Sequence, residues 1–279
     1  MARKPRPIAQ PAEYLTPLFD AHTHLASTGA KTAEEVKELL DKAEAAGVVG
    51  VCTVGDGLAE AELAAEHATM DPRVWAAVAI HPTRAKELVY SDDVKARLAE
   101  LAAQPRVVAV GETGLDWYWL EDMDNCANRE EQEESLRWHA KLAQSVNKPL
   151  MIHNREADTD LLRVLADIEP VTTVILHCFS SPLAVAEEAI ERGYVLSFAG
   201  NVTFKRNDEL RAAAKLCPQD QILVETDAPY MTPEPFRGSR NSSGIIGHTA
   251  RLLADVRGDA PEELAATVTA NARRIYDIS

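Results

Sequence analysis

The sequence predicts an α/β fold, a (β/α)8 TIM barrel in a single domain. Two observations favour it: short runs typical of β-strands alternate with longer amphipathic helical runs, and eight such units can be counted in 279 residues. Eight strands, each followed by a helix within roughly 250 residues, fit a barrel better than an open doubly wound sheet, which stays the alternative. No Gly/Pro/Ser-rich linker and no fixed repeat interrupts the pattern, so we expect one domain.

The predicted elements follow one another along almost the whole chain. The strands are expected at residues 18–24, 48–53, 74–80, 107–111, 150–153, 173–177, 194–198 and 222–226. Helices are expected between them, including residues 33–46, 58–70, 130–146, 157–168 and 183–192. For the last of these, Ser181 can serve as the N-cap, Pro182 suits the first turn, and Gly193 suits the left-handed residue after the helix. We expect residues 1–13 to form a disordered tail and residues 14–279 to form the barrel.

The charge and the cysteines exclude several classes of protein. Asp and Glu number 44 against 29 Lys and Arg, and the formal charge of -15 disfavours broad adhesion to nucleic acid or to anionic membranes. A polyanionic substrate would therefore need a locally basic pocket. Neither a signal peptide nor a transmembrane helix is indicated, so we expect a cytoplasmic protein with no membrane partner and no obligate protein partner. The four cysteines form no Cys-x-x-Cys pair, which makes a zinc-finger or disulfide framework unexpected.

Two histidines one residue apart, His22 and His24, end the first predicted strand. Alternate side chains of a strand point to the same face, so both imidazoles could bind one divalent ion. An isolated His-x-His pair could equally lie on the solvated face of a strand or in a turn, so the interpretation needs further ligands.

Further ligand-type residues follow other predicted strands at the end where barrel enzymes carry their active sites. They are Glu112, His153, His177 and Asp227. Each alone has an ordinary structural explanation, but their agreement in position predicts a shared metal site. Mixed His and carboxylate ligands suit Zn, Mn or Mg, and six ligands exceed the need of one ion, so we expect two divalent ions per subunit.

In such a site an activated water attacks an ester-like centre. We expect Glu112 to lie between the two ions, and Asp227 to bind one ion and accept a proton from the water.

Nine ordered motifs add a family resemblance. They are DAHTH at 20–24, AIHP at 79–82, GETGLD at 111–116, IHNREA at 152–157, HCFS at 177–180, SFAG at 197–200, ETDAPY at 225–230, RGSRN at 237–241 and NARR at 271–274. With these motifs the chain resembles the TatD-type metal-dependent hydrolases, a branch of the amidohydrolase-like barrels. The resemblance implies a (β/α)8 barrel, divalent-metal phosphodiesterase chemistry and removal of nucleotides from DNA ends. It also implies that the metal ligands are His22, His24, Glu112, His153, His177 and Asp227.

Two departures from the family pattern alter the predicted rim that meets the substrate. Ser181-Pro182 follows Ser180 where the family usually has Gly-Ser, and Ser242-Ser243 replaces the usual Glu-Pro. Substrate choice is therefore less firmly predicted than the metal chemistry.

Several other residues could meet the substrate. His81 could hydrogen-bond a phosphate or a leaving group, or cap the turn that Pro82 imposes. Arg155 could clamp a phosphate or pair with Glu156 or Asp116. The predicted phosphate-binding cations in the loops after the seventh and eighth strands, each with the alternative of an ordinary surface charge, are Lys205, Arg206, Arg237 and Arg240.

Residues beside the ligands have supporting roles in the prediction. We expect Glu225 and Asp116 to orient ligands rather than to bind a metal directly. The run from Trp117 to Trp119 could stack a base or pack over the barrel mouth. Cys178 should point away from His177 on a strand, so a catalytic thiol is not expected.

The leading functional hypothesis is a divalent-metal-dependent deoxyribonuclease, an exonuclease that cleaves phosphodiester bonds with a metal-activated water. DNA is the expected substrate, with RNA as a further candidate. One alternative is hydrolysis of a carboxylic ester or amide, such as a lactone or an aminoacyl-RNA. A scarcity of positive groups near the metals would favour this alternative. A non-catalytic barrel scaffold is the other alternative.

Overall fold

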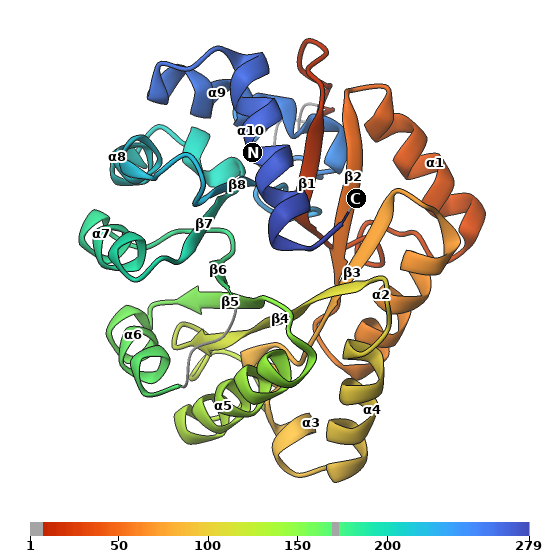
Figure 1. Ribbon diagram of the computed structural model, residues 1–279, viewed down its shortest axis with the longest axis vertical. Coiled ribbons are helices and arrows are strands. Elements are labelled where there is room, and N and C mark those ends of the chain that lie inside the picture. The colour runs from red at the N-terminus through yellow and green to blue at the C-terminus, as the bar shows by residue number, and fades with distance from the viewer. Residues whose placement is uncertain (1–7, 169–172, 279) are drawn as a thin grey trace, which may run out of the picture.

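Eight parallel strands form a nearly closed barrel with helices around it (Figure 1) in a computed structural model that describes residues 8–168 and 173–278. The strands are β1 (Leu18–Thr23), β2 (Val48–Val54), β3 (Val74–Val78), β4 (Val107–Asp116), β5 (Leu150–Arg155), β6 (Val174–Leu176), β7 (Val195–Phe198) and β8 (Ile222–Val224). Each strand pairs with the next in chain order. Thr23 forms a parallel bridge with Ala228, just after β8, which brings the two edges together. The predicted TIM-barrel class is confirmed, and the open sheet is not what forms.

Helices connect the strands and cover the outside of the barrel. They are α1 (Ala33–Glu44), α2 (Leu58–Met70), α3 (Lys86–Val89), α4 (Asp92–Ala102), α5 (Arg129–Val146), α6 (Asp158–Asp167), α7 (Leu183–Glu191), α8 (Asp208–Leu216), α9 (Gly247–Arg257) and α10 (Pro261–Ile275). Three short 3-10 helices lie in the loops: η1 (Pro82–Arg84), η2 (Gly200–Thr203) and η3 (Ser243–Ile245). None of the helices in the described ranges combines the length and apolarity of a membrane span.

Local sequence signals set several helix ends. Thr32 and Glu35 form a capping box at the start of α1, in which each side chain accepts from the backbone of the other. Gly193, after α7, has φ +76° as predicted. The prediction for Ser181 is wrong: Pro182 is the N-cap of α7, and the Ser181 hydroxyl instead donates to Asp158 at 2.5 Å.

A cluster of buried apolar side chains drawn from all eight strands fills the inside of the barrel. From the strands its members are Phe19, Ala21, Cys52, Val54, Ala77, Val108, Ala109, Met151, Ile175, Val195 and Leu223. The ring of Tyr276, after α10, lies 6.0 Å from Phe19, and its hydroxyl donates to the Ala21 carbonyl at 2.8 Å. The chain after α10 therefore packs against the end of the barrel where the strands begin. The polar side chains gather at the other end, where the strands finish.

The N-terminal segment is described from residue 8 onward, and residues 1–7 of the predicted tail lie outside the described residues. Residues 8–13 form no regular element. The carbonyls of Gln10 and Glu13 accept hydrogen bonds from His248 and Arg251 of α9, so part of the predicted tail lies against the barrel.

Candidate metal centre

All six residues predicted as ligands lie at the carboxyl ends of barrel strands. His22 is in β1 and His24 directly follows it, while Glu112 is in β4 and His153 in β5. His177 comes directly after β6, and Asp227 follows β8 by three residues. Every one of them is buried except His153, which is half-buried.

His22, His24 and Asp227 form one potential metal-binding group. The Nε2 atoms of the two imidazoles face each other at 3.1 Å. Asp227 Oδ1 lies 3.4 Å from His24 Nε2 and 3.7 Å from His22 Nε2. Asp227 reaches this place because its backbone N–H donates to the His22 carbonyl at 2.9 Å across the barrel seam.

Glu112 lies between this group and the other two histidines. Its Oε1 is 3.6 Å from His24 Nε2 and 3.9 Å from His22 Nε2. Its Oε2 is 2.5 Å from His177 Nε2 and 3.4 Å from His153 Nδ1. One carboxylate thus presents one oxygen to each histidine pair, which is the arrangement expected of a bridging ligand.

The donor set fits divalent cations. Burial and the nearby His177 hold the pKa of His22 well below its ordinary value, which keeps this ring in the neutral form that binds metals. Burial opposes ionisation of Glu112, but its contacts with His177 and His153 outweigh this and hold its pKa well below the usual range. Burial likewise opposes protonation of His24, yet Asp227 and Glu112 raise its pKa to about 9. The carboxylates therefore favour positive charge here, and a bound cation would displace the proton from His24.

Two further carboxylates fix the ring orientation of two histidines. Asp116 Oδ2 lies 2.9 Å from His153 Nε2, so the other ring nitrogen of His153 faces Glu112. Glu225 Oε1 lies 3.3 Å from His177 Nδ1, which leaves Nε2 of that ring for Glu112. These contacts place Asp116 and Glu225 beside two of the predicted ligands, and their orienting role stays a prediction.

Asp56 is a candidate ligand that the sequence analysis missed. It follows β2, and its Oδ1 lies 3.5 Å from His24 Nδ1, so that His24, Asp56 and Glu112 form another potential metal-binding group. Burial raises the pKa of Asp56. The sequence does indicate Asp56 as a candidate ligand, since it lies two residues after a strand at the same end of the barrel. Its flanking glycines, Gly55 and Gly57, are equally typical of an ordinary turn.

His81 caps the turn at Pro82, and its contact with a phosphate or a leaving group stays a prediction. Its Nδ1 accepts from the Thr83 backbone N–H at 3.3 Å, so it caps η1. Its ring also lies 4.4 Å from that of His153, and it forms a potential metal-binding group with Glu112 and His153. Burial and the adjacent His153 lower the pKa of His81 to about 3, which leaves a neutral ring facing the site.

Arg155 takes neither of the carboxylate partners considered for it. Its guanidinium lies 3.7 Å from the centre of the Tyr118 ring and 5.4 Å from that of Trp119. Asp116 is instead engaged by His153. Trp117 packs against the core and donates to Asp160, so in the aromatic run this residue has a packing role, while Tyr118 is 40% exposed at the rim.

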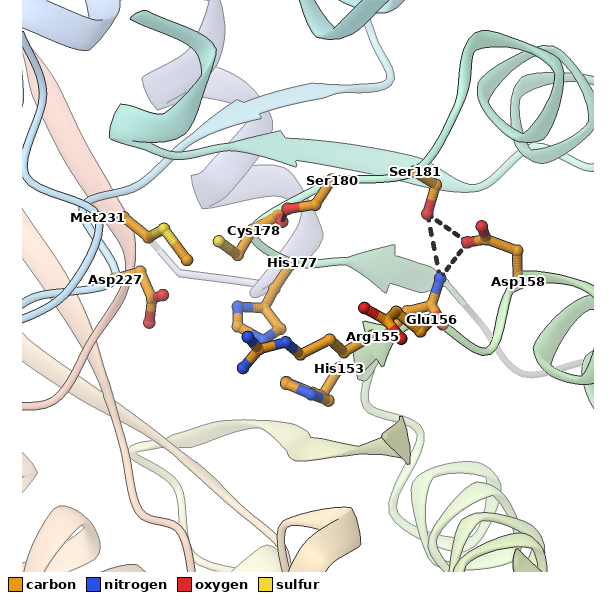
Figure 2. Close-up of a pocket in the computed structure, with 11 residues that line it drawn as sticks. His153, Arg155, Glu156, Asp158, His177, Cys178, Ser180, Ser181, Asp227 and Met231 are labelled. Carbon is orange, nitrogen blue, oxygen red and sulfur yellow. Dashed lines mark hydrogen bonds between the residues drawn. The ribbon is translucent and has the colours of Figure 1, made fainter. Parts of the chain in front are cut away.

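A cavity of about 360 Å³ opens beside the cluster, and Figure 2 shows the side chains around it. Its lining residues are His153, Asn154, Arg155, Glu156, Asp158, His177, Cys178, Ser180, Ser181, Asp227 and Met231. Lys205, Arg237 and Arg240, predicted to contact the substrate, are exposed and lie outside this lining. Arg240 donates to the Ser27 carbonyl, and Arg237 lies over the Phe204 ring. The structure therefore does not bring these three cations to the metal cluster.

The expectation for the side chain of Cys178 is wrong. The strand β6 ends at Leu176, and Cys178 has φ +43°, so strand alternation no longer applies and the side chain lines the same cavity as His177. Burial raises the pKa of the Cys178 thiol well above its ordinary value. The thiol therefore stays protonated at neutral pH, which does not favour a nucleophilic role.

The two departures from the family pattern lie in different places. Ser181 lines the cavity beside the metal cluster, and Pro182, the N-cap of α7, follows it in the chain. Ser242 and Ser243 instead line a small separate cavity of about 20 Å³ against α1. Only Ser181-Pro182 can thus alter the mouth of the site directly.

Comparisons with known proteins agree with this geometry. The family model described as TatD related DNase matches residues 19–277. The chain belongs to the TatD family. A Mycobacterium tuberculosis relative, named an uncharacterized metal-dependent hydrolase TatD, is 49% identical over 261 residues, which cover 94% of this chain and 98% of the relative. A Citrobacter rodentium relative, named a 3'-5' ssDNA/RNA exonuclease TatD, is 31% identical over 268 residues, with 94% and 98% covered.

A solved structure extends the agreement to three dimensions. The crystal structure of a TatD homologue from Escherichia coli K12 superposes with a TM-score of 0.81 at 25% identity, and covers 94% of this chain and 98% of that one. This TatD-family protein is therefore a metal-dependent hydrolase, and its cluster of His, Glu and Asp side chains is able to bind metal.

Proposed function

We propose that this protein is a nuclease that hydrolyses phosphodiester bonds at an end of a DNA strand, with RNA as a further substrate. The observation that carries the proposal is the position of Glu112, whose two oxygens face separate histidine pairs. The exonuclease name of several relatives supports the same substrate class.

Six residues would hold two divalent ions, for which Mg, Mn and Zn are the candidates. They are His22, His24, Glu112, His153, His177 and Asp227. When bound, such ions polarise a phosphoryl oxygen and lower the pKa of water.

The side chains around the ions supply position and proton transfer. Asp227 Oδ1 faces the His22/His24 pair and is the acceptor for the proton that the attacking water loses. Asp116 and Glu225 keep the His153 and His177 rings turned toward Glu112. Arg155, held against Tyr118 at the edge of the cavity, is placed to pair with a phosphate oxygen.

The test is a cleavage assay on end-labelled single- and double-stranded DNA and on RNA, with Mg, Mn or Zn and with excess chelator. We expect the single strand to shorten from one end in the presence of metal, and the chelator to stop it. Asp227→Asn should abolish cleavage, whereas Lys205→Ala, at an exposed cation outside the cavity, should not. A metal-loaded wild-type protein that leaves every nucleic acid intact would refute the proposal.

The lining of the cavity favours a second candidate function. Apart from the predicted metal ligands, it carries two carboxylates, Glu156 and Asp158, against one arginine, Arg155. A neutral carboxylic ester or amide, such as a lactone or an aminoacyl-RNA linkage, would meet less repulsion there than a free polyanion. Metal-dependent hydrolysis of a nitrophenyl carboxylic ester or of a lactone, together with inactivity on DNA, would favour this candidate.

The scaffold hypothesis predicts a protein that contains no metal after purification and does not respond to chelator, which metal analysis would show. A barrel that has lost catalysis is expected to lack some metal ligands, whereas the His and carboxylate cluster here is complete. The cytoplasmic location and the independence from a protein partner stay predictions from the sequence.

A further inference from the structure

A second cavity, of about 430 Å³, lies beside the one at the metal cluster. The two share Ser180, Ser181 and Met231 in their linings. The second cavity is bounded mainly by the loop between β7 and α8 and by the start of α8. Its remaining lining residues are Pro182, Asn201, Phe204, Arg206, Asn207, Glu209 and Leu210. A ligand longer than one nucleotide could therefore extend from the first cavity into the second.

The boundary between the two cavities is held in place by hydrogen bonds. Ser181 Oγ donates to Asp158 at 2.5 Å, and the Asn154 amide donates to both Ser181 and Asp158 (Figure 2). On the side of the second cavity, the Asn201 amide donates to Ser180 Oγ at 2.9 Å. The boundary includes Ser181-Pro182, the departure from the family pattern at the mouth. The second cavity is thus shaped in part by residues that depart from the usual family pattern.

The chemistry of the second cavity suits a nucleotide. Arg206 is exposed there and can pair with a phosphate, whereas Glu209 is the one carboxylate in the lining. Phe204 is half-buried, offers a ring to a base or sugar, and carries the Arg237 guanidinium 4.1 Å from its centre. Two arginines therefore lie at or next to this cavity. The chain as a whole has a formal charge of -15, so local cations of this kind are what a nucleic acid would need.

We propose that the second cavity is a subsite for the nucleotide that adjoins the scissile bond, with Arg206 at its phosphate and Phe204 against its base or sugar. This inference rests on the proposed nuclease function and deepens it. In this arrangement the nucleic-acid strand crosses the boundary at Ser180 and Ser181 between the reacting phosphate and the next phosphate. Arg206 is then a specificity-determining residue for polymeric substrates, not a catalytic residue.

The test compares two substrates that fill different parts of the site. The p-nitrophenyl ester of thymidine monophosphate carries only the reacting phosphate and offers no second phosphate to Arg206, whereas a single-stranded oligonucleotide of about ten nucleotides is long enough to span both cavities. Arg206→Ala should raise KM for the oligonucleotide roughly fivefold near 0.1 M salt, and reduce the slope of log KM against log salt by about 0.7, as expected when one single-strand phosphate contact is lost. Its kinetics on the small ester should stay at the wild-type level.

Lys205→Ala is the matched control, because Lys205 is the adjacent exposed cation and does not line either cavity. It should leave KM for the oligonucleotide near the wild-type value. Phe204→Leu keeps an apolar side chain but removes the ring, and should raise KM for the oligonucleotide only. Equal effects of Arg206→Ala and Lys205→Ala, or an equal loss on both substrates in Arg206→Ala, would overturn the subsite.

Failure of the nuclease function would give a different result. In that case the wild-type protein would hydrolyse neither substrate with any metal. Fluorescence anisotropy of the labelled oligonucleotide with the metal-loaded protein would still test the subsite. Weaker binding by Arg206→Ala than by Lys205→Ala would support it, and equal binding would contradict it.

Discussion

Replacing Glu225 by glutamine should separate metal affinity from fold stability. Glu225 is fully buried and accepts from the Cys178 backbone N–H at 2.8 Å and from Ser197 Oγ at 2.5 Å, while its Oε1 lies 3.3 Å from His177 Nδ1. Glutamine keeps the size and one carbonyl oxygen but removes the charge. The His177 ring would lose the carboxylate that fixes which of its nitrogens faces Glu112.

The two expected magnitudes differ. Loss of such an orienting partner typically lowers metal affinity by about 10–100-fold, or roughly 1.4–2.7 kcal/mol. For the fold, three charge-assisted hydrogen bonds become neutral ones, at a cost of about 1 kcal/mol each. The variant also removes the cost of burying a carboxylate, which is several kcal/mol and is the reason that the pKa of Glu225 is raised. These terms oppose each other, so we expect the unfolding free energy without metal to change by only about 1 kcal/mol.

The assay pairs Mn²⁺ titration calorimetry with urea unfolding in chelator. Ser197→Ala is the milder control, since it removes one donor to Glu225 and leaves the contact with His177 intact. The reasoning is refuted if Glu225→Gln binds Mn²⁺ as tightly as the wild type while its unfolding midpoint in chelator falls sharply. That outcome would give Glu225 a purely structural role.

Three further predictions concern the cluster and the core. Asp56→Asn should weaken Mn²⁺ binding, because Asp56 lies beside His24, whereas Glu156→Gln, at an exposed carboxylate of the same cavity, should not; equal metal stoichiometry and affinity in both would exclude Asp56 as a ligand. Mn²⁺ at about a hundred times its Kd should raise the unfolding free energy by about 2.7 kcal/mol per site, and a thermal midpoint indifferent to metal concentration would contradict this. Burial lowers the pKa of His139 from 6.5 to about 4. Between these pH values the unfolded chain binds a proton at His139 that the folded protein does not bind, so the unfolding free energy should fall by about 3 kcal/mol as the pH drops from 6.5 to 4. Urea unfolding measured across this pH range should show that the unfolding free energy of His139→Gln depends less steeply on pH than that of the wild type. An equally steep dependence in both proteins would contradict the role of His139.

The fold class followed from the sequence because each βα unit carries its own local signals. Strand-length apolar runs and helix-length amphipathic runs alternate, and a parallel sheet is the arrangement that connects them with short loops. Closure of the barrel could not be predicted from such local signals. It depends on Thr23 meeting Ala228, and on the hydrogen bond from the Asp227 backbone to His22, between residues about two hundred positions apart. The end signals of α7 were only partly informative, since the Ser181 hydroxyl donates to Asp158 instead of accepting from a backbone N–H at the start of the helix.

The sequence by itself determined which residues stand at the reactive end of the barrel, since a side chain at the carboxyl end of a parallel strand has little freedom to be elsewhere. It therefore predicted that His22, His24 and Glu112 would meet. Only the tertiary structure decided what each side chain contacts beyond its own strand: that Arg155 stacks on Tyr118, and that Cys178 turns into the cavity. These outcomes depend on loop conformations, which are set by packing between segments distant in the chain rather than by the period of a strand or helix.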